Sequence, residues 1–197
     1  MNIRSDLMRV SEIFNTIQGE GKNIGKPSTF VRLGYCNQSC HFCDTKYTWD
    51  FKEKPEYLND IKDMTPDVVA KDILSYPANN VVWTGGEPAI QQKDIYETIN
   101  ILRSKINSQY LHEMETAGTI ELEFPRMFRT ITVSPKDLVK QKYARTASTK
   151  WEYFNSLNNS VFKFVVEDEE HYEKLKQIIG EKRIVRPVYM MPEGVTA

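Results

Sequence analysis

The sequence predicts an α/β fold, a compact partial (βα) barrel of about six mostly parallel strands in a single domain of residues 1–197. Apolar strand-like segments alternate with helical patterns along the chain, which is typical of parallel βαβ units. The chain has 197 residues, whereas a complete eight-stranded barrel typically takes about 250 residues. Motifs rich in cysteine, glycine or proline follow several of the expected strands. Parallel α/β folds place their chemistry in such loops.

The strands are predicted from short apolar segments bounded by polar or glycine-rich stretches. The predicted strands are residues 28–35, 80–84, 110–115, 130–133, 160–166 and 184–189. The first leads into the cysteines, and the second ends in a Gly-Gly pair. His112 alternates on one of these strands and His171 lies on a solvated helix face, so neither is assigned a chemical role.

Helices are predicted between these strands. Thr65 is a candidate N-cap, Pro66 suits the first helical position, and Asp67 complements the helix dipole. Apolar residues recur at helical spacing over residues 94–106 and again after an acidic run at 167–170. The charged segment near 46–64 is predicted to be a surface excursion.

Charge and hydropathy exclude several classes of protein. Lysine and arginine number 26 and aspartate and glutamate 27, a net charge of −1 that excludes a polybasic nucleic-acid coat. The longest apolar run has four residues, at 188–191, whereas a membrane span needs about 20. The N-terminus lacks the apolar core of a signal peptide. We therefore expect a cytoplasmic protein without a nucleic-acid or membrane partner.

The cysteines carry the clearest chemical pattern. All three, Cys36, Cys40 and Cys43, lie within eight residues, and an odd number this close together is a poor disulfide framework. Three thiolates on one loop can hold three irons of a cubane cluster and leave the fourth iron open to another ligand. A structural zinc site completed by His41 as Cys₃His is the alternative on spacing alone.

The CxxxCxxC spacing resembles the radical S-adenosylmethionine (SAM) superfamily, and the aromatic Phe42 before the last cysteine fits it too. The superfamily's Gly-Gly-Glu-Pro element, which holds the methionyl amino group, is present as Gly85, Gly86, Glu87 and Pro88. The resemblance implies that the cysteines hold a [4Fe–4S] cluster whose open iron binds SAM. An electron from the cluster would then cleave SAM and yield a 5′-deoxyadenosyl radical.

Further motifs resemble the 7-carboxy-7-deazaguanine synthase family over residues 10–194, nearly the whole chain. They lie at residues 13–21 (IFNTIQGEG), 30–34 (FVRLG), 44–45 (DT), 115–119 (ETAGT), 134–136 (SPK) and 191–194 (MPEG). Ala117 stands where the family usually has asparagine. The implied reaction converts 6-carboxy-5,6,7,8-tetrahydropterin to 7-carboxy-7-deazaguanine with loss of ammonia, and regenerates SAM.

The resemblance also implies the site residues. The expected SAM and cofactor contacts are Phe42, Asp44, Gly85, Gly86, Glu87, Ser134, Lys136, Met190, Met191, Pro192 and Glu193. The expected substrate contacts are Ile17, Gln18, Gly19, Glu20, Arg32, Thr84, Glu115 and Thr116. Arg32 offers a fork of donors for a carboxylate, and Thr45 offers Mg²⁺ a neutral oxygen. A surface ion pair for Arg32, a helix cap for Thr45 and a plain turn at 18–21 are the alternatives.

Partners are expected from the same resemblance. They are the pterin substrate, an electron donor such as flavodoxin, and a second copy of the chain in a homodimer. The basic stretch 136–150 is a solvated surface or a docking patch for an acidic reductant. Other functions that share features of the sequence are a glycyl-radical activating enzyme and a zinc-binding module. The segment 18–21 and the pair at 44–45 argue against the activating enzyme.

Overall fold

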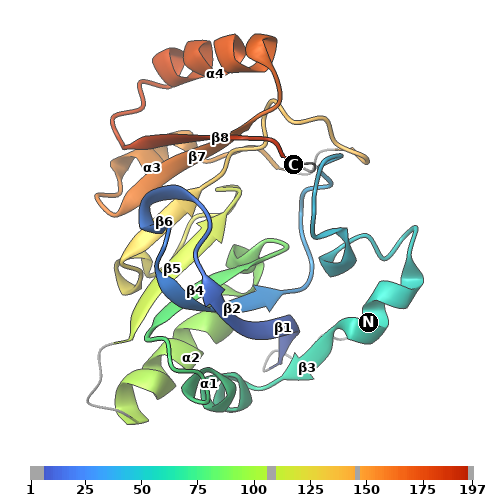
Figure 1. Cartoon of the computed structure of the whole chain (residues 1–197), viewed down its shortest axis with the longest axis vertical. Coiled ribbons are helices and arrows are strands. Elements are labelled where there is room, and N and C mark those ends of the chain that lie inside the picture. The colour runs from blue at the N-terminus through green and yellow to red at the C-terminus, as the bar shows by residue number, and fades with distance from the viewer. Residues whose placement is uncertain (1–6, 106–109, 145–146, 195–197) are drawn as a thin grey trace.

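The computed structural model describes residues 7–105, 110–144 and 147–194, which contain one eight-stranded sheet (Figure 1). The strand order is β3-β1-β2-β4-β5-β6-β7-β8. The strands are β1 (Met8–Ile17), β2 (Pro27–Leu33), β3 (Lys62–Met64), β4 (Asn80–Gly85), β5 (Leu111–Thr116), β6 (Thr130–Val133), β7 (Ser160–Val166) and β8 (Val188–Pro192). Neighbours from β2 through β8 are parallel, whereas β1 is antiparallel to β2 and β3. The predicted α/β fold, a mostly parallel sheet short of a closed barrel, is confirmed.

Helices connect the parallel strands. They are α1 (Pro66–Leu74), α2 (Gln92–Lys105), α3 (Trp151–Ser156) and α4 (Glu169–Glu181). Thr65 is the N-cap of α1, as predicted, although its side chain makes no capping hydrogen bond. Asp168 caps α4 by accepting from His171 N. The short α3 was not predicted, and the predicted end of the second helix at Ile106 lies outside the described residues.

The sheet differs from the prediction at its two edges. The sequence indicated no strand before residue 28, yet β1 spans ten residues. A register shift between Val10 and Glu12 interrupts the alternation of buried and exposed side chains by which a strand is recognised in a sequence. The last strand begins at Val188 rather than at residue 184, so Met190 and Met191 pair with β7 instead of following the strand. The excursion near 46–64 ends in β3, which pairs with β1.

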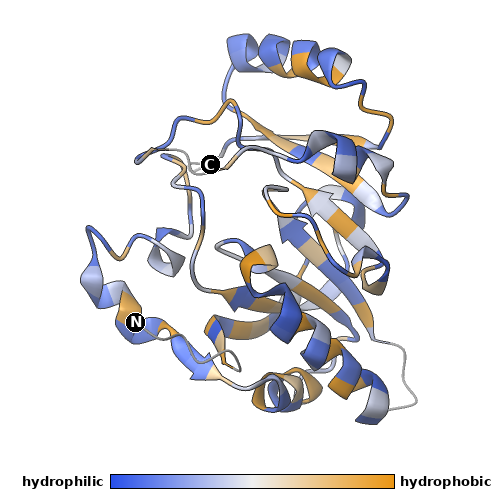
Figure 2. Cartoon of the chain, turned by 180° about the vertical axis from the view of Figure 1, so that it is seen from behind, coloured by the Kyte–Doolittle hydropathy of each residue, from blue (hydrophilic) through white to orange (hydrophobic). Residues whose placement is uncertain are grey.

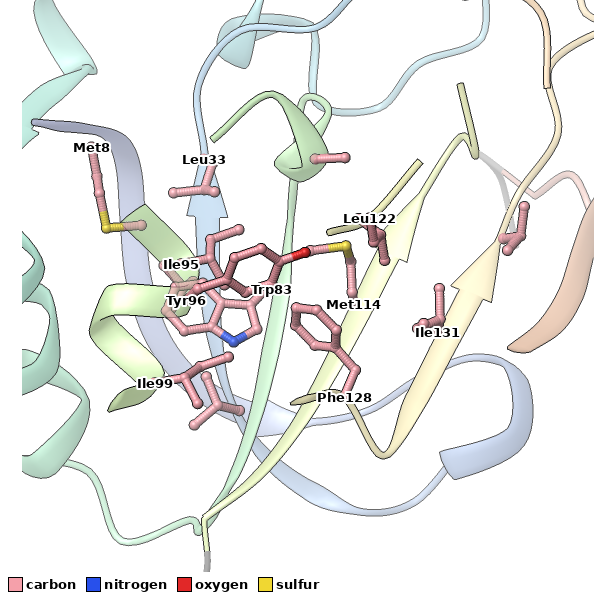
Figure 3. Packing of buried hydrophobic residues seen from close by; sticks show 14 of the residues in the cluster. Met8, Leu33, Trp83, Ile95, Tyr96, Ile99, Met114, Leu122, Phe128 and Ile131 are labelled. Atoms are coloured by element: carbon pink, nitrogen blue, oxygen red, sulfur yellow. The ribbon is translucent and has the colours of Figure 1, made fainter. Parts of the chain in front are cut away.

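The main core lies between α2 and the sheet (Figure 3). Trp83 from β4 and Met114 from β5 are fully buried against Ile95 and Ile99 of α2. Figure 2 shows hydrophobic and hydrophilic residues side by side along the helices, as expected for helices with one face on a sheet. The opposite face of the same strands carries polar side chains, including Thr84 and Glu115, which are hydrogen-bonded to each other. No described helix has the length and apolar character needed to cross a membrane.

The turn between β1 and β2 lies against this polar face (Figure 1). Lys26 Nζ lies 3.5 Å from Glu113 Oε1 on β5, and Asn23 donates to Thr130 Oγ1 on β6 at 3.3 Å. Glu20 forms an ion pair with Lys163 on β7. Contacts with three parallel strands hold the turn over the inner face of the sheet.

His112 is a buried core residue on β5. Its side chain is 2% exposed, and its Nδ1 accepts from Trp83 Nε1 at 3.3 Å. Burial lowers the pKa of His112 to about 3. The unfolded chain therefore binds a proton below about pH 6.5 that the folded chain excludes.

Stability is expected to fall with acidification because of His112. The linkage predicts a loss of about 2 kcal/mol in the free energy of unfolding between pH 8 and pH 5. Urea unfolding at several pH values measures this loss. The variant His112→Gln, whose amide oxygen still accepts a hydrogen bond, should show a flatter profile. An equal pH dependence in the variant and the wild type would contradict the prediction.

Candidate active site

The cysteines lie on the loop between β2 and a short 3₁₀ helix, η2 (Lys46–Thr48). Each sulfur is a hydrogen-bond acceptor for one N–H group. The pairs are Gln38 N and Cys36 Sγ (3.4 Å), Gln141 Nε2 and Cys40 Sγ (3.6 Å), and Trp49 Nε1 and Cys43 Sγ (3.3 Å). Burial raises the pKa of the Cys36 thiol to about 12. A metal that binds this sulfur must therefore displace its proton.

The Gly85-Gly86 turn at the end of β4 packs directly on the backbone of the cysteine loop. Gly86 N donates to Leu33 O at 2.9 Å, and Glu87 N donates to Tyr35 O at 2.8 Å. Gly85 has a φ of 116°, a conformation that favours glycine. A Cβ on Gly86 would lie 2.0 Å from Tyr35 O. The turn requires glycine for close packing, and it holds the start of the cysteine loop in place.

Glu87 lies behind the turn, fully buried. Its carboxylate accepts hydrogen bonds from Thr116 Oγ1 (2.7 Å), Ala89 N (3.0 Å) and Ala117 N (2.8 Å). Burial raises the pKa of Glu87, against the opposing effect of these hydrogen bonds and of Lys136. The side chain joins the ends of β4 and β5 and does not line the cavity beside the cysteines.

A cavity of about 310 Å³ adjoins the cysteine loop, a volume suited to a small-molecule ligand. Most residues predicted for the site line it: Glu20, Arg32, Cys36, Cys40, Phe42, Cys43, Asp44, Thr45, Thr84, Gly85, Gly86, Glu115, Thr116, Ser134, Lys136, Pro192 and Glu193. They come from the carboxyl ends of the parallel strands and from the β1–β2 turn. Tertiary folding therefore brings motifs from the whole chain to one cavity.

Some predicted site residues lie outside this lining. Met190 and Met191 lie within β8, and Gly19 and Glu87 are also absent from the cavity wall. Ile17 ends β1 with 61% exposure. Gln18 is buried and reaches the site indirectly, because its Nε2 donates to Glu115 Oε1 at 2.9 Å.

Other lining residues had been given no site role. They are Gln38, Trp49, Ala117, Lys163, Val165 and Gly194. Lys163 is the one with a recognisable signal, a charged residue inside the apolar strand SVFKFVV. Burial alone would lower the pKa of Lys163, but the carboxylates of Glu115 and Glu20 outweigh burial and raise it. Lys163 therefore presents a positive charge to the cavity.

Arg32 forms the ion pair that was one of the two alternatives considered from the sequence. It lines the cavity, and its Nε lies 2.8 Å from Glu12 Oε1. Tyr47 Oη donates to the same carboxylate oxygen at 2.8 Å, and the guanidinium lies 5.4 Å from the centre of the Phe14 ring. The pair with Glu12 and the ring of Phe14 fix the guanidinium in the cavity wall.

Lys136 and Ser134 form a second polar group in the wall. Lys136 Nζ donates to Ser134 Oγ at 2.8 Å and lies 5.7 Å from the centre of the Phe42 ring. Burial lowers the pKa of Lys136, and the nearby Cys40 opposes this effect. In the described part of the basic stretch, Lys136 lines the cavity and Lys142 pairs with Asp50 at 2.6 Å, whereas Lys140 and Lys150 are exposed.

Residues 31–139 match the profile of the Radical SAM superfamily. The 7-carboxy-7-deazaguanine synthase of Hyperthermus butylicus is 32% identical over 194 residues, which cover 94% of this chain and 77% of the relative. The enzyme of the same name from Pyrobaculum aerophilum is 34% identical over 188 residues, covering 94% and 79%. The chain belongs to the 7-carboxy-7-deazaguanine synthase family of the radical SAM superfamily. The crystal structure of QueE from Escherichia coli matches with a TM-score of 0.73 at 27% identity, over 97% of this chain and 85% of that one.

Membership of the superfamily implies a [4Fe–4S] cluster and SAM, and three cysteines on one loop can hold such a cluster. Within the described residues, no three cysteine, histidine or carboxylate side chains converge on a single-ion site. His41 is exposed, and its Nε2 lies 3.6 Å from Glu167 Oε2. A cubane cluster instead gives each thiolate its own iron. Cys36, Cys40 and Cys43 around one cavity suit that arrangement.

Thr45 lies beside the last cysteine. Its Oγ1 is 3.5 Å from Cys43 Sγ, and the residue lines the cavity. Thr45 takes the N-cap position of η2, but its side chain makes no capping hydrogen bond. Thr45 therefore occupies the predicted cap position without a capping hydrogen bond, and it lines the cavity.

Proposed function

We propose that this radical SAM enzyme converts 6-carboxy-5,6,7,8-tetrahydropterin to 7-carboxy-7-deazaguanine with loss of ammonia. The supporting observation is that one cavity places three thiols beside the cationic groups of Arg32, Lys136 and Lys163. Both SAM and the pterin carry a carboxylate, and charge-assisted hydrogen bonds from cationic side chains suit such groups. The names of the relatives support the same reaction.

Polar residues of the wall have distinct roles in this proposal. When bound, the cluster supplies the electron for reductive cleavage of SAM. Lys136 and Ser134, held together at 2.8 Å, donate hydrogen bonds to the carboxylate or ribose of SAM. The guanidinium of Arg32 binds the pterin carboxylate with two parallel N–H groups.

In this proposal Glu115 holds the pterin ring. Its two carboxylate oxygens already accept from Gln18 Nε2 at 2.9 Å and Thr84 Oγ1 at 2.8 Å, so the side chain is fixed. A carboxylate oxygen has a second acceptor site, which suits the N–H groups of the pterin's amide edge. This assigns Gln18 to positioning Glu115 and leaves Glu115 as the group that touches substrate.

The turnover assay under exclusion of oxygen tests the proposal. The reconstituted protein receives SAM, a reductant, Mg²⁺ and the pterin, and products are identified by mass spectrometry. We expect 7-carboxy-7-deazaguanine without stoichiometric loss of SAM. Release of 5′-deoxyadenosine without that product would overturn the assignment of the pterin as substrate and would favour a glycyl-radical activating enzyme. Zinc without iron or sulfide after reconstitution would favour the binding module.

Thr45 is proposed as a ligand of Mg²⁺, because it lines the cavity and its hydroxyl oxygen lies 3.5 Å from Cys43 Sγ. We expect Thr45→Ala to weaken the stimulation of turnover by Mg²⁺ and to raise the Mg²⁺ concentration needed for half-maximal rate. Thr45→Ser keeps the hydroxyl group and should respond like the wild type. A Mg²⁺ response in Thr45→Ala equal to that of the wild type would remove the residue from the metal site.

A flavodoxin-like electron donor and a homodimer complete the proposal. The donor is supported by the need for an external electron in this superfamily. The electron donor is tested by mixing the protein with a purified reduced flavodoxin and following reduction of the cluster by its absorbance.

The homodimer is tested by light scattering, with an expected mass of twice the 23.0 kDa of one chain.

A further inference from the structure

Two of the N–H groups at the cysteine sulfurs come from side chains outside the CxxxCxxC motif. Trp49 donates its indole N–H to Cys43 Sγ at 3.3 Å. Gln141 donates from its amide to Cys40 Sγ at 3.6 Å, across 101 positions of sequence. Neither residue belongs to the CxxxCxxC pattern.

The segment 139–143 orients the amide of Gln141. Ser39 N donates to Gln141 Oε1 at 2.6 Å, which directs the NH₂ of that amide away from Ser39 and toward Cys40. Tyr143 N donates to Ser39 Oγ at 2.9 Å, and His41 N donates to Lys140 O at 3.0 Å. This segment therefore holds residues 39–41 of the cysteine loop.

Trp49 is held just as firmly. Asp50, its neighbour, is 3% exposed and accepts from Lys142 Nζ at 2.6 Å and from Tyr143 Oη at 2.8 Å. The Trp49 and Tyr143 rings meet edge to face with centroids 6.4 Å apart. The indole has one hydrogen-bond donor and no acceptor, so in this orientation it can only donate to Cys43 Sγ.

We propose that the Trp49 indole N–H raises the reduction potential of the [4Fe–4S] cluster. The one-electron reduction of the cluster adds a negative charge that the cluster shares with its thiolates. An N–H donor at Cys43 Sγ stabilises the reduced state more than the oxidised state, and hydrogen bonds to sulfur are a recognised control of cluster potentials. Trp49 thus acts on the cluster through Cys43, because its N–H group stabilises the negative charge on that sulfur.

The inference rests on the cluster that superfamily membership implies, and does not depend on which substrate the enzyme takes. Trp49→Phe keeps an aromatic ring against Tyr143 and removes the N–H. Trp151→Phe is the matched control, because Trp151 stacks on Phe162 at a centroid distance of 5.8 Å. Both variants and the wild type are reconstituted without oxygen, and iron and sulfide per chain are measured first.

Redox titration followed by electron paramagnetic resonance then gives the midpoint potential of each cluster. We expect the midpoint of Trp49→Phe to shift to a more negative value at unchanged iron and sulfide content, and that of Trp151→Phe to equal the wild type. An unshifted midpoint in Trp49→Phe would overturn the proposal. So would an equal shift in Trp151→Phe.

A second variant separates the N–H from the packing of the ring. Incorporation of 3-benzothienylalanine at position 49 replaces the indole N–H by sulfur and keeps the bicyclic shape. We expect the same negative shift as in Trp49→Phe, and a midpoint equal to the wild type would overturn the proposal. It also keeps the test decisive where Trp49→Phe fails to fold. Failure of the proposed reaction would be distinguishable from failure of this inference. In that case the wild-type protein would contain a redox-active cluster but would form no deazaguanine product.

Discussion

Alanine in place of Gly86 is expected to lower the free energy of unfolding by about 3 kcal/mol, at the upper end of the usual cost of overpacking. The added Cβ would lie 2.0 Å from the carbonyl oxygen of Tyr35 and 2.5 Å from its carbon. Both are backbone atoms of the cysteine loop, so no flexible side chain can move aside. The loop must shift as a whole, which also displaces Cys36 from the cavity wall. Urea unfolding of the cluster-free protein measures the effect.

The control for this substitution is Gly180→Ala in α4. No atom lies within 4 Å of a Cβ built on Gly180, and alanine in a helix is favoured over glycine by roughly 0.5–1 kcal/mol. The control should therefore unfold at a slightly higher urea concentration than the wild type. If Gly86→Ala unfolded at the wild-type concentration, the close packing of the glycine turn on the cysteine loop would be contradicted.

Serine in place of Cys40 is expected to abolish both the cluster and turnover. Cys40 is 7% exposed and accepts a hydrogen bond from Gln141, so its sulfur is already held in place for a metal. Serine keeps the shape of the side chain but replaces a soft thiolate with a hard oxygen that iron–sulfur clusters accept poorly. Iron and sulfide content, visible absorbance and product formation should all fall to background.

The interpretation depends on a folded variant. The urea midpoint of cluster-free Cys40→Ser should match that of the cluster-free wild type, since both lack the metal. Retained iron, sulfide and turnover would contradict the assignment of Cys40 as a ligand. Loss of iron together with a collapse of the urea midpoint would instead place Cys40 in the packing of the loop, against the prediction.

Local patterns were sufficient for much of the fold. The strands at 130–133 and 160–166 were predicted at their observed bounds, because each is a short segment rich in β-branched or aromatic residues. The beginning of α1 was predicted from Thr65 and Pro66. The bulge after Val10 concealed β1, and β3 has only three residues, too few for a pattern.

The sequence alone determined the class of chemistry: three cysteines on one loop, a Gly-Gly turn after a buried strand, and the order of the motifs along the chain. These features are local, so they can be recognised without knowledge of the fold. Only the tertiary structure decided which remote side chains join the site. Gln141 lies 101 positions from Cys40, and Lys163 lies 143 positions from Glu20. Such partners depend on how the strands are ordered in the sheet, and side chains that meet through strand order leave no periodic signal in the sequence.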